Sequence, residues 1–226
     1  DLDALARLWP LPAAEQIVVA EGDTLSRVLV QDTGGVQQIN LILERGAQAL
    51  FYVLNCGGDC GRVDLSVTLK QGAHFSLQAA QIGGDSQTLE IVTTVTHAEP
   101  DATSRQTVRS VLAGHATGTY LGKVAVARDA QHTDSEQSVK AMLLDRTATA
   151  NAKPELEIFA DDVKCAHGCA IGELDPVALF YLESRGLPPA DARTLLLQAF
   201  VSGVFDGAED AEALQALALA KLGALA

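Results

Sequence analysis

The feature that most constrains this fold is a long series of short alternating apolar segments that no amphipathic helix interrupts. In "RVDLSVTLK", residues 62–70, every second residue is apolar, so one face of an extended chain is apolar and the other is polar. The apolar members are Val63, Leu65, Val67 and Leu69. Further short runs follow between about residue 15 and residue 160. The pattern predicts a mainly β fold and disfavours a doubly wound α/β fold.

A weak internal repeat narrows the choice of β architecture. "LERGAQALFYVLN" at 43–55 and "LKQGAHFSLQAAQ" at 69–81 share L-x-x-G-A before an apolar run, and "LDRTA" at 144–148 repeats it with threonine for glycine. A repeat with a period in the twenties is typical of solenoids, in which each coil stacks on the one before. The repeat therefore favours a parallel β-helix over a β-sandwich.

The C-terminal part of the chain changes to a helical pattern. In "LDPVALFYLESRG", Asp175 is placed as an N-cap, Pro176 at the first helical position and Gly186 just past the end. Two more helical segments follow, in 187–207 and 208–223. We predict that this tail caps the open edge of the solenoid; docking of a partner is the alternative.

The chain divides into three predicted parts. Residues 1–14 form a short N-terminal segment, in which residues 2–8 favour a helix that "WPLP" ends. Residues 15–172 form the β-helix core, and residues 173–226 form the C-terminal helical domain.

Charge and composition exclude several classes of function. The formal net charge is −13, which disfavours nucleic acid and anionic membranes as partners because the charges repel. No apolar run approaches the roughly 20 residues of a membrane span. No targeting segment is visible and the apolar content, 48%, is enough for a core without disulfides. We therefore expect a cytoplasmic protein with free thiols.

Common catalytic motifs are absent from the sequence. It has no G-x-x-x-x-G-K-[ST] phosphate loop, no G-x-S-x-G elbow and no H-E-x-x-H zinc helix. We expect Cys56 and Cys60, in "NCGGDC", to be small buried thiols at a turn. Four histidines lie in predicted strands or turns without ligand-like neighbours, and we assign them no role. They are His74, His97, His115 and His132.

The segment "DDVKCAHGCAIG", residues 161–172, places two cysteines and a histidine within five positions. If it is extended, Cys165, His167 and Cys169 project from one face and Lys164 from the other. Thiolate and imidazole suit zinc, copper and iron–sulfur chemistry, but three ligands leave a site open. Lys164 is expected to lower the pKa of a neighbouring thiol. The alternative is that both cysteines are core residues and the histidine caps a turn at Gly168.

Residues 154–200 closely resemble the SufB/SufD family of iron–sulfur cluster assembly proteins. "SRQTVRSVL" at 104–112 and "GKVAVARDAQHTDSEQSVKAMLLD" at 122–145 resemble the core of the same family. The resemblance spans most of residues 90–205, and residues 15–90 fit more loosely. "DDVKCAHG" resembles the SufD members, whose motif carries Lys-Cys-Ser-His-Gly, more than the glutamate-rich SufB version. The resemblance implies a right-handed parallel β-helix followed by helices.

The resemblance also implies a function as a non-catalytic scaffold. A SufB-like paralogue would pair with the end of the β-helix, and the helical tail would hold a SufC-like ABC ATPase. A transient iron–sulfur cluster would assemble at the paralogue interface, where His167 matches the family's motif histidine and Cys165 its motif cysteine. The chain alone would hold no stable cofactor. The expected ATPase contacts are Leu179, Phe180, Leu182, Leu196 and Phe200.

Two departures from the family and two alternatives remain open. Cys169 stands where the family commonly has alanine, so this thiol either joins the site or fills space; with Lys164 it is a possible auxiliary residue. The long N-terminal helical region of many members is missing from this sequence. Either the protein is natively short or the chain is trimmed. A homodimer in isolation is an alternative to the heterocomplex. A stand-alone metal-binding or thiol enzyme on a β-helix is the alternative function.

Overall fold

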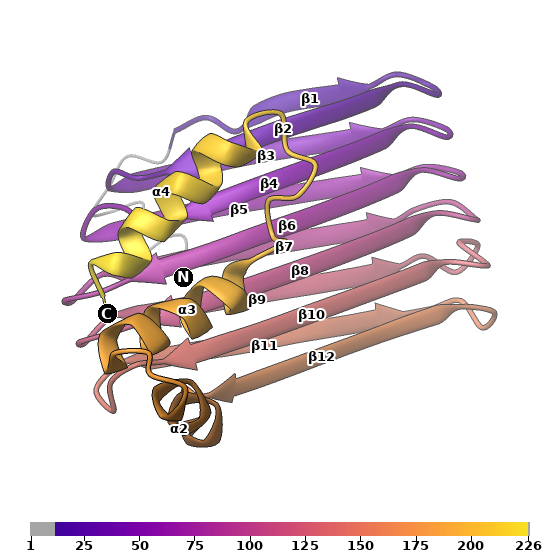
Figure 1. Ribbon diagram of the computed structural model, residues 1–226. Helices are drawn as coiled ribbons and strands as arrows, with labels where there is room; N and C mark the ends of the chain where they lie inside the picture. Colours follow the sequence, from indigo (N-terminus) through magenta and orange to yellow (C-terminus); the bar gives the residue numbers. More distant parts are fainter. Residues whose placement is uncertain (1–11, 226) are drawn as a thin grey trace.

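In the computed structural model, which describes residues 12–225, two six-stranded parallel sheets face each other and three helices follow them (Figure 1). The odd-numbered sheet contains β1 (Glu15–Val19), β3 (Gly35–Leu43), β5 (Cys60–Leu69), β7 (Thr88–His97), β9 (Thr117–Val126) and β11 (Thr149–Ile158). The even-numbered sheet contains β2 (Thr24–Gln31), β4 (Gln48–Asn55), β6 (His74–Gly83), β8 (Thr103–Leu112), β10 (Asp134–Leu143) and β12 (Lys164–Gly172). The helices are α2 (Pro176–Ser184), α3 (Pro189–Val201) and α4 (Ala211–Gly223).

The chain winds alternately through the two sheets, so each strand pairs in parallel with the strand two places later. Glu15 pairs with Ile39, which lies 24 residues further on. Thr117 pairs with Thr149, 32 residues further on. The last coils are therefore longer than the first. Parallel pairing of strands two places apart confirms the predicted parallel β-helix, and the three helices confirm the helical C-terminal segment.

Apolar side chains from alternate strand positions fill the space between the sheets. Leu65 and the three other apolar residues of its segment are 2% exposed or less, which confirms the predicted inward face. Two aromatic rings, Phe51 and Phe75, lie 6.0 Å apart in the same cluster. Burying one such side chain typically stabilises a fold by about 1.5–3 kcal/mol.

The L-x-x-G-A repeat marks one corner of the solenoid. Leu43 and Leu69 pair in register at the ends of β3 and β5. Gly46 and Gly72 follow them, each with φ of 66°, a left-handed conformation that glycine adopts without a Cβ clash. Residues 144–148 follow β10 instead and lie at the opposite corner. The prediction that they form a third copy of this turn is therefore wrong. Local sequence identity does not specify which corner a turn occupies.

The first helix of the tail begins and ends as its sequence predicts. The Asp175 side chain accepts a hydrogen bond from Val177 N at 2.8 Å, and Pro176 is the first helical residue. Gly186, just beyond the helix, has φ of 93°.

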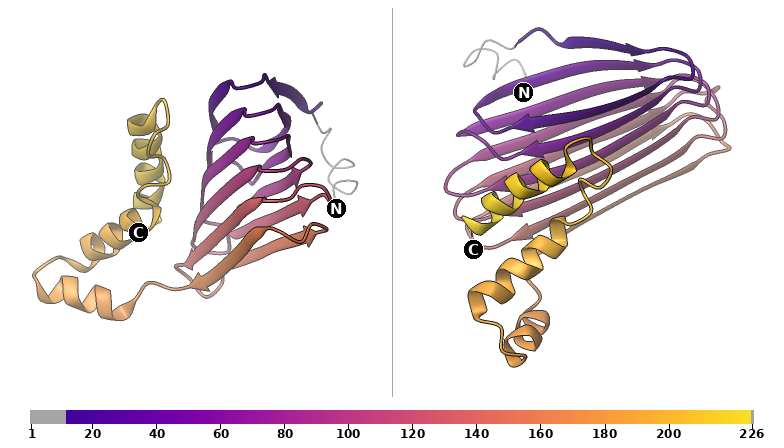
Figure 2. Two further views of the ribbon diagram at one scale, coloured as in Figure 1. Left: turned by 90° about the vertical axis from the view of Figure 1, so that its right-hand side faces the viewer. Right: turned by 45° about the horizontal axis from the view of Figure 1, so that its top comes forward.

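The tail does not cap the open edge of the solenoid, and that prediction is wrong. Helices α3 and α4 lie along the outer face of the even-numbered sheet (Figure 2). Leu197 and Leu222 are buried there in one cluster with the outward-facing Leu54, Ile82 and Val111. The outer face of this sheet is apolar, and so is one side of each helix. Packing the helices on the sheet buries both apolar surfaces.

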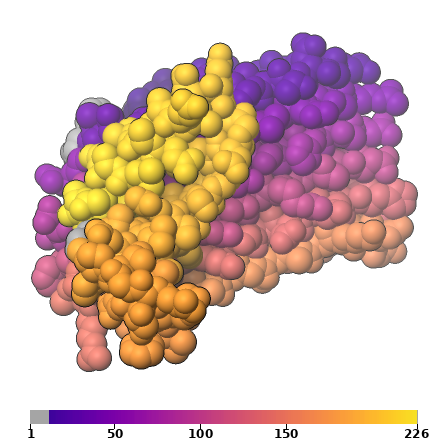
Figure 3. All heavy atoms as spheres, in the orientation of Figure 1, coloured from indigo at the N-terminus to yellow at the C-terminus, as the bar shows by residue number. Residues whose placement is uncertain are grey.

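The last coil, formed by β11 and β12, is left without a cover among the described residues. Figure 3 shows the tail over only part of the solenoid, with the last coil running along its lower edge. The short helix expected over residues 2–8 lies outside the described range. None of the helices within residues 12–225 is long and apolar enough to cross a membrane.

Candidate functional site

The Cys–His segment forms β12, the last strand of the even-numbered sheet. Its only neighbour in the described sheet is β10, with Ser135 opposite Cys165, Gln137 opposite His167 and Val139 opposite Cys169. Those three β10 residues are buried and face the interior of the solenoid. Cys165, His167 and Cys169 therefore share the inward face of the last coil, on the single face that the sequence predicted.

These side chains are accessible although they face inward, because no described coil stacks on them. Cys165 is half-buried, whereas His167 and Cys169 are exposed. A hollow of about 360 Å³ lies beside the strand, lined by residues of β10 and β12 that include Gln137 and His167. The alternative of core cysteines and a turn-capping histidine is wrong, since Cys169 is exposed and Gly168 lies within the strand.

The surroundings of the Cys165 thiol raise its pKa and so favour the protonated form. Burial is the largest effect and raises its pKa, the Asp134 carboxylate raises it further, and a backbone hydrogen bond at Ser135 offsets part of the rise. The expectation that Lys164 lowers this pKa is not met, because Lys164 projects from the opposite face of the strand. A metal ion would have to displace the thiol proton on binding.

Beneath His167 the interior of the solenoid is polar. Tyr120 Oη donates to Gln106 Oε1 at 3.1 Å, and Thr93 Oγ1 donates to the same oxygen at 2.8 Å. Gln137 Nε2 donates to Tyr120 Oη at 3.2 Å. Gln106, Gln137 and His167 occupy successive positions of one row across β8, β10 and β12. Sequence reasoning missed this network; the signal was a glutamine at an inward position of two neighbouring strands.

A second polar row ends at Cys165. His97 Nε2 lies 2.9 Å from Ser104 Oγ, which lies 2.9 Å from Ser135 Oγ, and Ser135 pairs with Cys165. The imidazole of His97 is completely buried, and this burial lowers its pKa to about 4 although a backbone hydrogen bond at Ala102 acts in the opposite direction. His97 is therefore neutral at physiological pH and belongs to the interior.

The described chain does not assemble a complete metal site. Across residues 12–225, no three His, Cys, Asp or Glu side chains gather closely enough to hold a metal ion. Imidazole and thiol groups are nevertheless suitable ligands for iron. A metal at β12 would therefore need further ligands from another chain or from its own sulfide.

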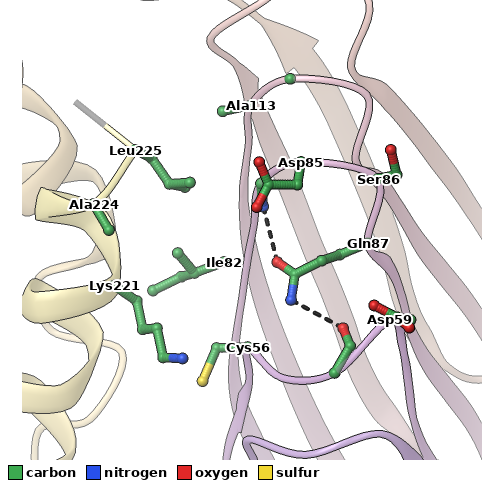
Figure 4. Close-up of a pocket in the computed structure, with 13 residues that line it drawn as sticks. Cys56, Asp59, Ile82, Asp85, Ser86, Gln87, Ala113, Lys221, Ala224 and Leu225 are labelled. Carbon is green, nitrogen blue, oxygen red and sulfur yellow. Dashed lines mark hydrogen bonds between the residues drawn. The ribbon is translucent and has the colours of Figure 1, made fainter.

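The other cysteine pair lies near a second hollow, of about 640 Å³, between turns of the solenoid and the end of α4 (Figure 4). Cys56 is buried, as predicted, whereas Cys60 is only half-buried. Burial raises the pKa of Cys56, and Lys221, which extends from α4 beside it, offsets part of this effect. Gln87 closes the turns by accepting from Gly84 N and donating to Gly58 O. All four cysteines are free.

The residues predicted to contact an ATPase lie on α2 and α3 with different exposure. Phe180 is 70% exposed. The remaining four, Leu179, Leu182, Leu196 and Phe200, are half-buried. Sequence reasoning missed Val177 and Tyr181, which are exposed beside Phe180 on a helix that buries none of its residues. We call Val177, Phe180 and Tyr181 the α2 patch.

The fold and the exposed Cys–His strand define a parallel β-helix with an incomplete set of metal-ligating side chains on its last coil. In a comparison with known families, the family described as "SUF system FeS cluster assembly, SufBD core domain" matches residues 13–200. The chain therefore belongs to the SufB/SufD family of iron–sulfur cluster assembly proteins, and within it the chain is SufD-like.

The regions matched in three relatives cover most of this chain but less than half of each relative. The iron–sulfur cluster assembly protein SufD of Escherichia coli is 29% identical over 185 residues, which is 81% of this chain and 44% of the relative. A SufBD family protein of Synechocystis is 33% identical over 167 residues, 73% of this chain and 37% of the relative. The chloroplastic protein ABCI7 of Arabidopsis thaliana is 36% identical over 204 residues, which is 88% of this chain and 43% of the relative.

Proposed function

We propose that this chain is a non-catalytic, SufD-like scaffold that helps to build and pass on nascent iron–sulfur clusters. It pairs with a SufB-like paralogue through β11 and β12 and holds a SufC-like ATPase on its C-terminal helices. The observation that carries the proposal is the position of His167 on the inward face of the last coil. Within residues 12–225, this coil has no cover and His167 has no complete set of metal ligands around it.

The uncovered end of the solenoid suits a paralogue that is itself a β-helix. Strands β11 and β12 are the last of their sheets in the described part of the chain, so each has an edge there that can accept another strand. Ile158 and Ile171 face inward here, opposite the buried Val126 and Ala141, and a further coil would bury them. Adding such a coil removes both the apolar exposure and the open edges.

The cluster is the cargo of this site, and the chain supplies only part of its ligands. A neutral imidazole nitrogen of His167 binds iron through its lone pair. The Cys165 thiol supports it from the same face and gives up its proton if its sulfur binds iron. Cysteine thiolates of the paralogue complete the shell. A shared shell suits a scaffold because separation or rearrangement of the two chains releases the cluster.

The α2 patch is a second surface, separate from the end of the solenoid, and it suits a different protein partner. Helix α2 contributes nothing to the buried core, yet Phe180 and its two neighbours expose large apolar surfaces. Such a cluster of exposed aromatic side chains is typical of an interaction site. The ATPase would bind here and supply the phosphate loop that this sequence lacks.

The test of the cluster ligand is His167→Ala in complexes co-expressed with SufB and SufC and purified without oxygen. We expect subunit association to persist. The unfolding midpoint of the chain should stay at the parent value because His167 is exposed in the lone chain. Iron and acid-labile sulfide should fall several-fold. Cys169→Ala is the control on the same face and should have a milder effect. Parent-level iron and sulfide in His167→Ala would refute the ligand role.

The test of the paralogue interface is Ile171→Asp, which places a charge on the uncovered end. We expect SufB association to weaken by at least tenfold in size-exclusion or titration experiments, because a buried unpaired carboxylate is strongly unfavourable. Val18→Asp is the matched control, since Val18 is an exposed apolar residue of the first strand, at the other end of the solenoid. Equal effects of the two substitutions would contradict this docking surface.

The test of the ATPase site is the double substitution Phe180→Ser with Tyr181→Ser. Co-purification of SufC should be lost while SufB binding persists. A deletion of the whole tail is less informative, since α3 and α4 cover apolar residues of the even-numbered sheet. Retained SufC binding in the double variant would place the ATPase on another surface.

A further inference from the structure

The polar network under the proposed cluster site ends in an unpartnered acceptor. Gln137 is 1% exposed, and its Nε2 is used in the bond to Tyr120. Its Oε1 has no hydrogen-bond partner among the described residues. Buried carbonyl oxygens without a donor are rare in folded proteins, because burial removes their bonds to water.

The hydroxyl groups below Gln137 determine which way its amide points. Tyr120 has a single phenolic proton, which it donates to Gln106 Oε1. The Tyr120 oxygen can then only accept, so the Gln137 amide turns its nitrogen toward Tyr120. Its oxygen is consequently directed away from that bond, and Gln137 lines the same hollow as His167.

The imidazole of His167 is the donor in the adjacent position. His167 pairs with Gln137 in register and projects from the same face, one strand spacing of about 4.8 Å away. Both side chains are long enough to meet across that spacing. Within residues 12–225 the His167 ring makes no hydrogen bond of its own, so an N–H is free to turn toward the glutamine.

We propose that Gln137 is a positioning residue for His167. Its buried Oε1 accepts a hydrogen bond from the protonated ring nitrogen of His167. This bond fixes one tautomer and leaves the lone pair of the other ring nitrogen directed at the iron. The inference rests on the proposed function of His167 as a cluster ligand. It adds a role for the buried row that runs from Gln106 through Gln137.

The test is the tautomer of His167 in the full chain, read from the nitrogen-15 shifts of labelled histidines at pH 8.5. His167→Gln identifies the resonance. In the parent we expect one ring nitrogen to carry the proton predominantly. Gln137→Met keeps a similar shape without the acceptor, and should move the tautomer ratio by roughly two- to tenfold toward that of free imidazole. An unchanged ratio in a folded Gln137→Met protein would overturn the proposal.

Ser110→Ala is the matched control. Ser110 is also buried and donates to Gln81 Oε1 at 2.8 Å, but it does not pair with a residue of β12. Its loss should leave the His167 tautomer at the parent ratio; an equal shift would show a general loosening of the interior and overturn the proposal. If Gln137→Met does not fold, Tyr120→Phe is the second variant. It removes the oxygen that accepts from the Gln137 amide and should shift the tautomer ratio in the same direction.

Cluster loading separates this inference from the proposed function. In anaerobic complexes with SufB and SufC, Gln137→Met should lower iron and sulfide while Ser110→Ala keeps the parent content. Full loading in His167→Ala refutes the cluster-ligand role, whatever Gln137 does. Low loading in His167→Ala together with parent loading and parent tautomer ratio in Gln137→Met refutes only the positioning role.

Discussion

Buried His97 should make the stability of this protein depend on pH in a way that one substitution removes. The ring is completely buried and its Nε2 lies 2.9 Å from Ser104 Oγ. Burial, the largest cause, lowers its pKa in the folded state from 6.5 to about 4. The unfolded chain therefore binds a proton at a higher pH than the folded chain does.

The sign and size of the effect follow from this difference. Above pH 6.5 the imidazole is neutral in both states, and its full contribution to stability is present. As the pH falls toward 4 the unfolded state takes up a proton that the folded state does not, so the free energy of unfolding decreases. The total loss is about 3 kcal/mol, of which about 2 kcal/mol falls between pH 7 and pH 5.

The assay is urea unfolding from pH 5 to pH 7.5 for the parent and His97→Gln. Carboxylates and other histidines also contribute to the slope, but they are common to both proteins and cancel in the difference. The variant should be less stable at pH 7.5, and its deficit should shrink by about 2 kcal/mol at pH 5. His115→Gln, at an exposed turn position, is the control. A deficit of His97→Gln that does not change with pH would refute the assigned burial of the neutral ring.

Three further substitutions or treatments test the packing of the solenoid. Leu65→Ala should cost about 2–5 kcal/mol of unfolding free energy in urea melts, through lost burial and a cavity; a change under about half a kcal/mol would contradict its inward position. Gly57→Ala should destabilise by at least about 1–3 kcal/mol in thermal melts, because a Cβ would lie 1.7 Å from the Asp32 carbonyl carbon. Gly168→Ala is the control, since nothing lies within 4 Å of its added Cβ, and equal costs would refute the close approach at Gly57. Cys56 should resist iodoacetamide in the folded protein, judged by mass spectrometry, since it is buried and its pKa is raised; rapid labelling at low urea would show that α4 does not cover it.

Local patterns in the sequence were sufficient for the class of fold and for the shared face of the Cys–His strand. The alternation around Leu65 specifies an inward face because strand side chains alternate with a period of two. Asp175, Pro176 and Gly186 specify the bounds of α2 because caps depend on neighbours in the chain. The same period predicted the shared face of Cys165, His167 and Cys169, and the motif around His167 resembled the family that the comparison then established.

The tertiary structure decided everything that depends on which coil lies next to which. Residues 144–148 resemble the other turns but lie at the opposite corner, and the tail covers the outer face of a sheet rather than the open end. Lys164 does not activate Cys165, because adjacent residues of a strand face opposite sides while Asp134 and burial act on the thiol. Gln137 lies 30 residues from His167 in the sequence, yet neighbours it in the sheet. Contacts between coils are set by register, and register depends on the summed lengths of all the intervening strands and turns, which no local pattern encodes.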